Sequence, residues 1–270
     1  MFGSNLEIIA LTAVNLNTKY LSCVPFFIEF WLSLKSRNPG VRFTPKVLIV
    51  AQNLPTELER YRPWCQVIGN AGKLPSAFYS QAVRLYQPSL ENCDLVLTTD
   101  VDMFPMGDKV IEAALEKISQ GAKFVVCRDV LPNGQFPMCY NLAAPETWQI
   151  VSKVRTSEQV KSALESLFEE TSRNITYEAV HGGEGWFTDQ QELFRLVTDF
   201  EKFGGAVARL KDRDTGHRRL DRSFYPFPLN WLSIPLVALG HYSDYHVHHP
   251  ASKHKIFIQT LLRIGTRVTH

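Results

Sequence analysis

The amino-acid sequence predicts an α/β fold in which helices flank a mostly parallel central sheet. In the first half of the chain, short apolar runs of strand length alternate with longer segments whose apolar residues have helical spacing. The strand-like runs are rich in Val, Ile and Leu, which is typical of parallel strands covered on both faces. Hydrophobic residues make up 45% of the 270-residue chain and charged residues 21%, which are ordinary values for a globular protein.

Strands and helices are expected to alternate from the amino terminus to about residue 130. The run KVLIVA at 46–51 is unbroken and partly β-branched, and DLVLTT at 94–99 has the same character. The helix that begins at residue 20 is expected to end before Pro39, and the helix at 76–86 ends before Pro88. The predicted strands are 6–13, 46–51, 65–68, 94–99 and 123–127, and the predicted helices are 20–36, 54–60, 76–86 and 107–120.

The second half is less regular, and we expect it to fold back over the sheet within a single domain covering residues 1–270. Helices are expected at 145–155, 157–170 and 188–201, and strands at 206–210 and 236–242. The tail at 253–267 alternates basic and apolar residues. As a helix it is basic and amphipathic, so it either packs on the domain or makes peripheral contact with an anionic membrane.

Charge, cysteine content and the first residues exclude several classes of protein. The 29 Lys and Arg nearly balance 27 Asp and Glu, and a net charge of +2 gives no general case for a nucleic-acid partner. The five cysteines are scattered and contain no Cys-x-x-Cys pair, which argues against a disulfide framework and a structural zinc site. The start lacks the basic region of a signal peptide, and no apolar run is unbroken enough to span a bilayer, so a cytoplasmic location is predicted.

The sharpest local signal is the segment LVLTTDVDMFP, in which Asp100 and Asp102 directly follow a buried strand. Residues two apart in an extended segment point the same way. The carboxyl end of a parallel strand opens into the crevice where α/β sheets bind ligands. Two carboxylates there suit Mg²⁺ or Mn²⁺ with positions left for substrate phosphates, although a pair of solvated turn residues would have the same sequence.

A second candidate is the glycine-rich segment that leads into the predicted helix at 188–201. It runs Gly182-Gly183-Glu184-Gly185-Trp186-Phe187-Thr188-Asp189-Gln190. Asp189 and Gln190 offer a carboxylate and an amide to a polar ligand such as a sugar, and Trp186 is a candidate for stacking on an acceptor. An ordinary loop with a helix cap is the alternative.

A third candidate is the segment 241–255, which holds five of the eight histidines of the chain. His246 and His248 are expected on one face of a strand, with His249 facing the other way or turning out before Pro250. Neutral imidazole binds Mn²⁺ or Zn²⁺ well, and Lys253 and Lys255 offer point charges for phosphate.

Together these segments resemble the GT-A class of nucleotide-sugar-dependent glycosyltransferases, and within it the glycogenin-like and bacterial galactosyltransferase-like retaining enzymes. Members of that group carry an Asp-x-Asp (DXD) strand end, then Asp-Gln-Asp at a helix start, then His-x-x-Gly-x-x-Lys. The similar segments here, in the same order, are Asp100-Val101-Asp102, Asp189-Gln190-Gln191 and His249 to Lys255. Gln191 and Ser252 depart from the pattern, in place of the second Asp and the Gly.

The resemblance also covers the nucleotide end of the site. An Arg on the helix before the Asp-x-Asp strand is usual in this group, and Arg84 occupies that position. The first strand, with Ala13, Asn15 and Tyr20 at and after its end, is similar to the nucleoside-binding start of the family. The resemblance implies a nucleotide-sugar-binding half at about 1–130, followed by an acceptor-side half with the metal and phosphate segment at about 131–270.

The function that the resemblance implies is transfer of a sugar, with retention, from a nucleoside-diphosphate sugar to a glycan or other hydroxyl acceptor. A UDP-sugar is the expected donor and Mn²⁺ or Mg²⁺ the expected cofactor. Asp189 and Gln190 would act at the donor sugar beside Arg84. The implied metal ligands are Asp100, Asp102 and His249, with His248 or His246 as alternatives, and Lys253 and Lys255 would bind the diphosphate. Tyr140, Asn141 and Trp186 are candidate acceptor residues.

Two other functions compete with this one. A metal-dependent nucleotidyltransferase or phosphohydrolase also places Asp-x-Asp after a strand, and a catalytically silent sugar-binding protein would share the fold. The basic segment 209–222 is expected to be a solvated loop with internal ion pairs, or else a flap over the donor diphosphate or an acidic acceptor.

Overall fold

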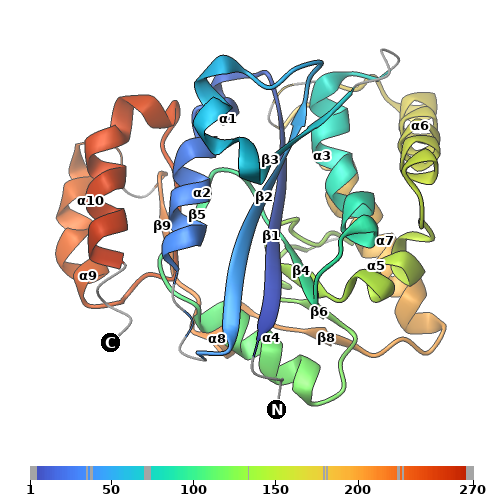
Figure 1. Ribbon diagram of the computed structural model, residues 1–270. Coiled ribbons are helices and arrows are strands. Elements are labelled where there is room, and N and C mark those ends of the chain that lie inside the picture. Colours follow the sequence, from blue (N-terminus) through green and yellow to red (C-terminus); the bar gives the residue numbers. More distant parts are fainter. Residues whose placement is uncertain are drawn as a thin grey trace.

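The computed structural model describes residues 5–34, 36, 39–69, 74–132, 134–178, 180, 182–223, 226 and 228–265 (Figure 1). Its centre is a seven-stranded sheet in the order β3-β2-β1-β4-β7-β6-β8. The strands are β1 (Leu6–Asn15), β2 (Val41–Val50), β3 (Cys65–Ile68), β4 (Leu95–Thr98), β6 (Phe124–Val126), β7 (Asn141–Ala143) and β8 (Val207–Arg209). Strand β7 runs antiparallel to β4 and β6, and the other pairs are parallel. The predicted mixed α/β fold with a mostly parallel sheet is confirmed.

Helices cover both faces of this sheet (Figure 1). Strand β1 shows why, because its side chains alternate between two cores. Ile8 and Ala10 belong to the core that contains the residues of α2, α4 and α10, whereas Ile9 and Leu11 belong to the core of α3, α5, α6 and α7. The helices are α1 (Thr18–Leu21), α2 (Val24–Ser33), α3 (Ser76–Tyr86), α4 (Lys109–Ser119), α5 (Pro145–Ser152), α6 (Ser157–Asn174), α7 (Thr188–Lys202), α8 (Asp212–Thr215), α9 (Ile234–Ala238) and α10 (Lys255–Gly265). Short 3₁₀ segments lie at Thr56–Trp64, Gln87–Leu90, Leu229–Ser233 and Ala251–His254.

A second, three-stranded sheet joins distant parts of the chain. It has the order β5-β10-β9, formed by β5 (Met103–Pro105), β10 (Asp244–His246) and β9 (Arg219–Asp221). Strand β10 is antiparallel to β5 and parallel to β9, and it places His246 opposite Met103 on one side and Asp221 on the other. The segment after the Asp-x-Asp motif is thereby fixed to the carboxyl-terminal part of the chain.

The large sheet has a topological switch point beside β1. From β1 the chain moves outward to β2 and β3, and then returns to β4 on the opposite side of β1. In such sheets, ligands bind in the crevice at the carboxyl ends of the strands that flank the switch point. Here those ends are Ala13 to Asn15 in β1 and the residues that follow Thr98 in β4.

Several predicted elements differ from the structure. The strand expected at 236–242 is wrong, because Ile234–Ala238 forms helix α9 with a proline in its first turn, a position that favours helix initiation. The helix expected at 20–36 is divided into α1 and α2, and residue 35 lies outside the described residues. The tail predicted as one helix over 253–267 contains a 3₁₀ turn followed by α10, and residues 266–267 lie outside the described residues.

Two further findings concern helices and cysteines. Among the described residues, no helix combines the length and the apolar character needed to cross a bilayer. All five cysteines carry free thiols.

Candidate functional site

A cavity of about 390 Å³ lies at the switch point and collects side chains from both halves of the chain. Its wall includes the end of β1, the segment after β4, one face of helix α3, the glycine-rich loop and the start of α7. The predicted site residues that line it are Ala13, Asn15, Tyr20, Arg84, Asp100, Val101, Asp102, Trp186, Asp189, Gln190 and His246. Their roles stay predictions, but the structure brings them to one place.

The remaining predicted residues lie outside the cavity lining. Lys253 and Lys255 are exposed, in the 3₁₀ turn before α10 and at the start of that helix. Tyr140 and Asn141 are buried, where the Tyr140 hydroxyl donates to Asp244 Oδ2 at 3.3 Å and Asn141 Nδ2 donates to the carbonyl of Pro137 at 2.8 Å. These contacts are structural, and an acceptor role for the two residues stays a prediction.

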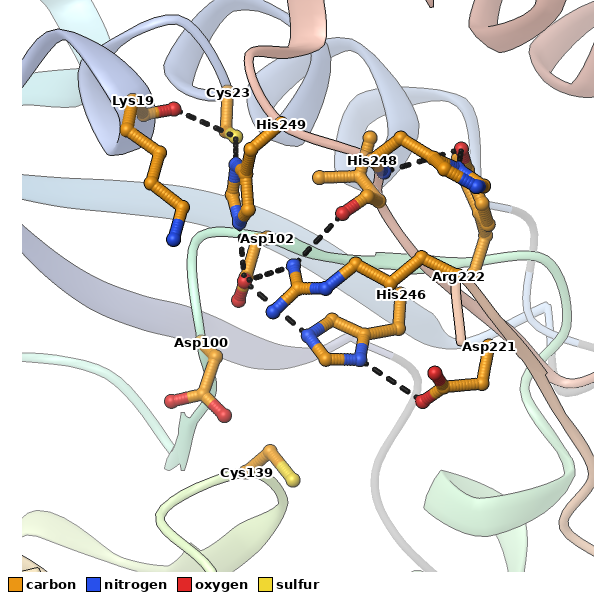
Figure 2. A network of polar contacts seen from close by, with 12 residues as sticks. Lys19, Cys23, Asp100, Asp102, Cys139, Asp221, Arg222, His246, His248 and His249 are labelled. Carbon is orange, nitrogen blue, oxygen red and sulfur yellow. Dashed lines mark hydrogen bonds and ion pairs between the residues drawn. The ribbon is translucent and has the colours of Figure 1, made fainter. Parts of the chain in front are cut away.

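Three nitrogen groups converge on one carboxylate oxygen, Asp102 Oδ2 (Figure 2). His249 Nε2 lies 3.0 Å away, Arg222 Nη1 3.1 Å and His246 Nε2 3.3 Å. The Asp102 side chain is only 11% exposed. Burial favours its neutral form, but the hydrogen bonds with His246 and His249 and the charge of Arg222 outweigh burial. They hold the pKa of Asp102 well below its usual range.

The backbone explains how these histidines reach Asp102. The Val247 N–H donates to the Asp102 carbonyl at 3.0 Å, which continues the β5–β10 pairing up to the motif. His246 Nδ1 contacts Asp221 Oδ2 at 3.0 Å, so this imidazole is held between two carboxylates. The ring of His249 packs edge-on against Tyr20 with a centroid distance of 5.2 Å. Burial, followed by the charge of Asp102, raises the pKa of Tyr20 to about 12.

His246 and His248, the two alternative ligands, are separated by the fold. His246 reaches Asp102, whereas His248 Nδ1 lies 2.7 Å from the Tyr245 hydroxyl. The sequence predicts His246 and His248 on one face of a strand. Strand β10 ends at His246, so His248 lies beyond it and does not reach the Asp-x-Asp motif. Figure 2 shows His246 and His249 directed toward Asp102.

The donor types around Asp102 fit a divalent cation. A carboxylate oxygen and a neutral imidazole nitrogen are both ligand types for such an ion, and Asp102 Oδ2 and His249 Nε2 lie 3.0 Å apart in hydrogen-bond contact. Asp100 is instead paired with Arg84, and within the described ranges no group of three or more His, Cys, Asp or Glu is arranged to hold a metal ion. Asp102 and His249 are therefore of the chemical types that bind a divalent cation, whereas Asp100 forms an ion pair with Arg84 in this conformation.

Arg84 joins the Asp-x-Asp motif to the start of helix α7. Its guanidinium pairs with Asp100 Oδ1, donates to Asp189 Oδ2 at 2.9 Å and donates to the Thr99 carbonyl at 3.2 Å. The Arg84 side chain is 9% exposed and that of Asp189 4%. Burial raises the pKa of Asp189 to about 6. Arg84 opposes this rise, whereas the charge of Asp100, which shares the same guanidinium, adds to it.

The site also contains residues that the sequence did not single out. Lys19, Arg219 and Arg222 line the cavity, and Asp221 orients His246. Gln81 on α3 accepts a hydrogen bond from the Tyr177 hydroxyl at 2.6 Å and donates to the Trp186 carbonyl at 3.4 Å, which fixes the glycine-rich loop. The concentration of charge in 209–222 is the signal that pointed toward Arg219 and Arg222, but it does not distinguish them from the other basic residues of that segment.

The fold and the cavity define an α/β protein with a polar ligand site at the switch point of a parallel sheet. No known protein-family profile matches the chain, and no curated protein matches its sequence. Among solved structures it is similar to the apo form of the glycosyltransferase GlyE of Streptococcus pneumoniae TIGR4, with a TM-score of 0.50 and 14% identity over 98% of this chain and 63% of that one. A second GlyE structure gives a TM-score of 0.47 and 12% identity over 97% of this chain and 63% of that one. The chain thus spans just under two thirds of the length of GlyE in these structures, and the likeness concerns the fold.

Proposed function

We propose that the protein is a glycosyltransferase of the GT-A type that transfers a sugar from a nucleoside-diphosphate sugar to a hydroxyl acceptor. The observation that carries this proposal is the cavity at the switch point, where Asp102 with its two histidines faces the pair formed by Arg84 and Asp189. Such a cavity has cationic and metal-binding chemistry for a diphosphate beside a carboxylate and an amide for a sugar. The fold shared with GlyE, which is a glycosyltransferase, agrees with it.

Within this proposal, each end of the cavity serves one part of the donor. Ala13 and Asn15 at the end of β1, with Tyr20 in α1, would contact the nucleoside, for which uridine is our proposal. Asp189 and Gln190 lie at the start of α7 and would orient the donor sugar together with Arg84. Trp186 borders the same cavity and is available to an acceptor sugar.

A divalent cation, Mn²⁺ or Mg²⁺, is part of the proposal. Asp102 and His249, together with Asp100, would hold it, and when bound it would stabilise the negative charge that develops on the departing diphosphate. Asp100 would have to exchange its pairing with Arg84 for this role. His246 is the alternative ligand nearest to Asp102, at 3.3 Å.

Retention of the anomeric configuration is the finer part of the proposal. Gln190 follows the buried Asp189, and the two side chains would lie against the sugar face from which the diphosphate departs. Such a site orients the reacting groups and stabilises charge, with no strong base required.

The test is a panel of nucleotide sugars incubated with the protein and followed by NMR, with and without Mn²⁺. We expect slow hydrolysis of a UDP-sugar that needs the cation, and the first-formed product anomer to match the donor. Binding of UDP with Mn²⁺ is read in parallel as a rise in the melting temperature. Release of pyrophosphate from a nucleoside triphosphate would favour a nucleotidyltransferase. Binding of sugars without any turnover would favour a silent sugar-binding protein.

We also propose peripheral contact with an anionic membrane through α9 and α10, which lie side by side (Figure 1). Three large apolar side chains there are mostly exposed: Leu232 at 72%, Leu239 at 79% and Ile256 at 73%. Lys253 and Lys255 are exposed next to Ile256. From residue 223 onward the sequence has a single acidic residue, Asp244, and it is buried. An apolar surface beside basic residues, in a segment whose single acidic residue is buried, matches an anionic bilayer.

Vesicle sedimentation tests this contact. Leu232→Ser with Leu239→Ser should weaken binding to phosphatidylglycerol-containing vesicles at least about tenfold, since two exposed leucines that would enter the bilayer are lost. The control is Phe203→Ser, because Phe203 is 87% exposed at the end of α7. Equal binding of all three proteins, or equal binding of the unaltered protein to vesicles of phosphatidylcholine alone, would contradict the proposal.

A further inference from the structure

Two arginines of the segment 209–222 reach the cavity and have no ligand assigned to them in the proposed function. Arg219 and Arg222 both line the cavity, with side chains 21% and 24% exposed. Strand β9 contains Arg219 and ends at Asp221, directly before Arg222. It pairs in parallel with β10, where Arg219 lies opposite Asp244 and Asp221 opposite His246. Leu220 between them is fully buried, so the side chains of 219 and 221 leave the strand on its other face.

Arg222 is held in place by one nitrogen. Its Nη1 donates to Asp102 Oδ2 at 3.1 Å and to the Val247 carbonyl at 2.8 Å. A guanidinium has five N–H donors in one plane, and in the described part of the chain both hydrogen bonds of Arg222 leave from Nη1. Figure 2 shows the side chain extended across the site toward Asp102. The guanidinium is therefore oriented, with donors left for a ligand.

Arg219 has a buried donor without a partner. Among the described residues its Nε makes no hydrogen bond, and the nearest acid oxygen, Asp244 Oδ1, lies 3.5 Å away. Its Nη2 contacts the weak acceptor Cys139 Sγ at 3.6 Å. The charge of Arg219 balances the buried Asp244, and its loose hydrogen bonding leaves guanidinium N–H groups for a ligand.

Each arginine has an acidic partner, Asp102 for Arg222 and Asp244 for Arg219. Arg84 is already shared by Asp100 and Asp189. Asp102 forms an ion pair with Arg222, and Lys19 and Arg219 add further positive charge to the lining of the cavity. Each planar guanidinium fork can bind phosphate oxygens in pairs, so two of them in one cavity suit a group with two linked phosphates.

We propose that Arg219 and Arg222 form a diphosphate-binding clamp in this cavity. If the proposed function holds, the ligand is the diphosphate of a nucleotide sugar. The clamp rests on the proposed function only for the identity of the attached nucleoside. The clamp assigns diphosphate binding to cations inside the cavity, whereas the family resemblance implies Lys253 and Lys255, which are exposed outside its lining.

Inorganic pyrophosphate is the probe, titrated calorimetrically into the full chain in the presence of EDTA. Arg219→Met and Arg222→Met should each weaken binding about tenfold or more, as expected for the loss of a hydrogen-bonded charge, and the double variant should bind about as weakly as orthophosphate. Arg213→Met is the matched control, because this arginine of the same segment has an 80% exposed side chain outside the cavity lining. It should bind pyrophosphate within about twofold of the unaltered protein.

The conservative variants separate binding from folding. Arg219→Lys and Arg222→Lys keep the charge but lose the planar fork, so they should restore folding and bind pyrophosphate with intermediate affinity. If Arg222 serves only to pair with Asp102, Arg222→Met will lower the melting temperature and leave pyrophosphate affinity unchanged, which overturns the clamp. A larger loss in Lys253→Met with Lys255→Met than in the double arginine variant also overturns it, as does absence of pyrophosphate binding by the unaltered protein.

The outcome is distinguishable from failure of the proposed function. Pyrophosphate binding that depends on both arginines, in a protein that turns over no nucleotide sugar, supports the clamp and contradicts the glycosyltransferase. Turnover of a UDP-sugar with pyrophosphate affinity unchanged in both arginine variants supports the enzyme and contradicts the clamp. Displacement of pyrophosphate by UDP, measured in the same calorimeter, identifies the clamp with the donor position.

Discussion

Asp102→Asn is expected to lower the rate of sugar transfer about 100- to 1,000-fold, the range found when one preorganised charge-stabilising group is removed from an active site. Asparagine keeps the shape of the side chain but removes the negative charge on which His246, His249 and Arg222 converge. The variant would lose its affinity for the proposed cation and the orientation of both imidazoles. The measurement is the initial rate of UDP-sugar hydrolysis or transfer, with the donor taken from the NMR panel.

A carboxylate outside the cavity supplies the control for Asp102→Asn. Asp199 on α7 is 34% exposed and pairs with Arg195 at 3.2 Å, and Asp199→Asn should leave the rate within about twofold of the unaltered protein. Retention of more than a tenth of the rate in Asp102→Asn would remove Asp102 from the proposed centre. A titration of Mn²⁺ against protein, read by electron paramagnetic resonance, gives a second readout that does not depend on turnover.

Arg84→Met is expected to destabilise the fold by about 3–5 kcal/mol, because breaking a buried ion pair leaves an uncompensated charge. Asp189 is 4% exposed and would keep no cation within hydrogen-bond distance, whereas Asp100 is 34% exposed and can be hydrated. At this chain length, each kcal/mol corresponds to about 2–4 °C in the melting temperature. Thermal unfolding followed by circular dichroism measures the change.

Two companion variants separate the buried pair from general effects of removing an arginine. Arg84→Met with Asp189→Asn removes both charges and should recover much of the lost stability, because a matched polar or apolar replacement avoids the stranded carboxylate. Arg195→Met removes a 55% exposed arginine that pairs with Glu192 and Asp199, and should cost less than about 1 kcal/mol. Equal losses in Arg84→Met and Arg195→Met would show that the buried network adds little to stability.

The elements that local pattern determines were predicted closely. Strand β3 and the bounds of helix α3 agree with prediction, since a β-branched run and a proline-terminated amphipathic segment carry their own signals. The apolar run after Ser233 was interpreted as a strand because short buried helices and strands look alike in periodicity. Pro235 at the start of α9 was the overlooked signal, since it favours the first turn of a helix.

Sequence patterns predicted only those residues of the candidate site that lie at the end of one strand or at the start of one helix. Asp100 and Asp102 follow β4, and Asp189 begins α7, so topology alone brings them to one edge of the sheet. Arg219 and Arg222 depend instead on the pairing of three-residue strands far apart in the sequence, and strands this short carry almost no local signal. The same pairing decided which histidines reach Asp102.

The second sheet has a consequence for synthesis of the protein on the ribosome. All seven strands of the large sheet are complete once residue 209 has been made, whereas β9 and β10 follow at 219–221 and 244–246. A nascent chain that has emerged only as far as β8 thus contains all strands of the large sheet, while Asp102 still lacks Arg222, His246 and His249. Because domains acquire their structure as the chain is extended, the contacts around Asp102 form only after every strand of the large sheet has been synthesised.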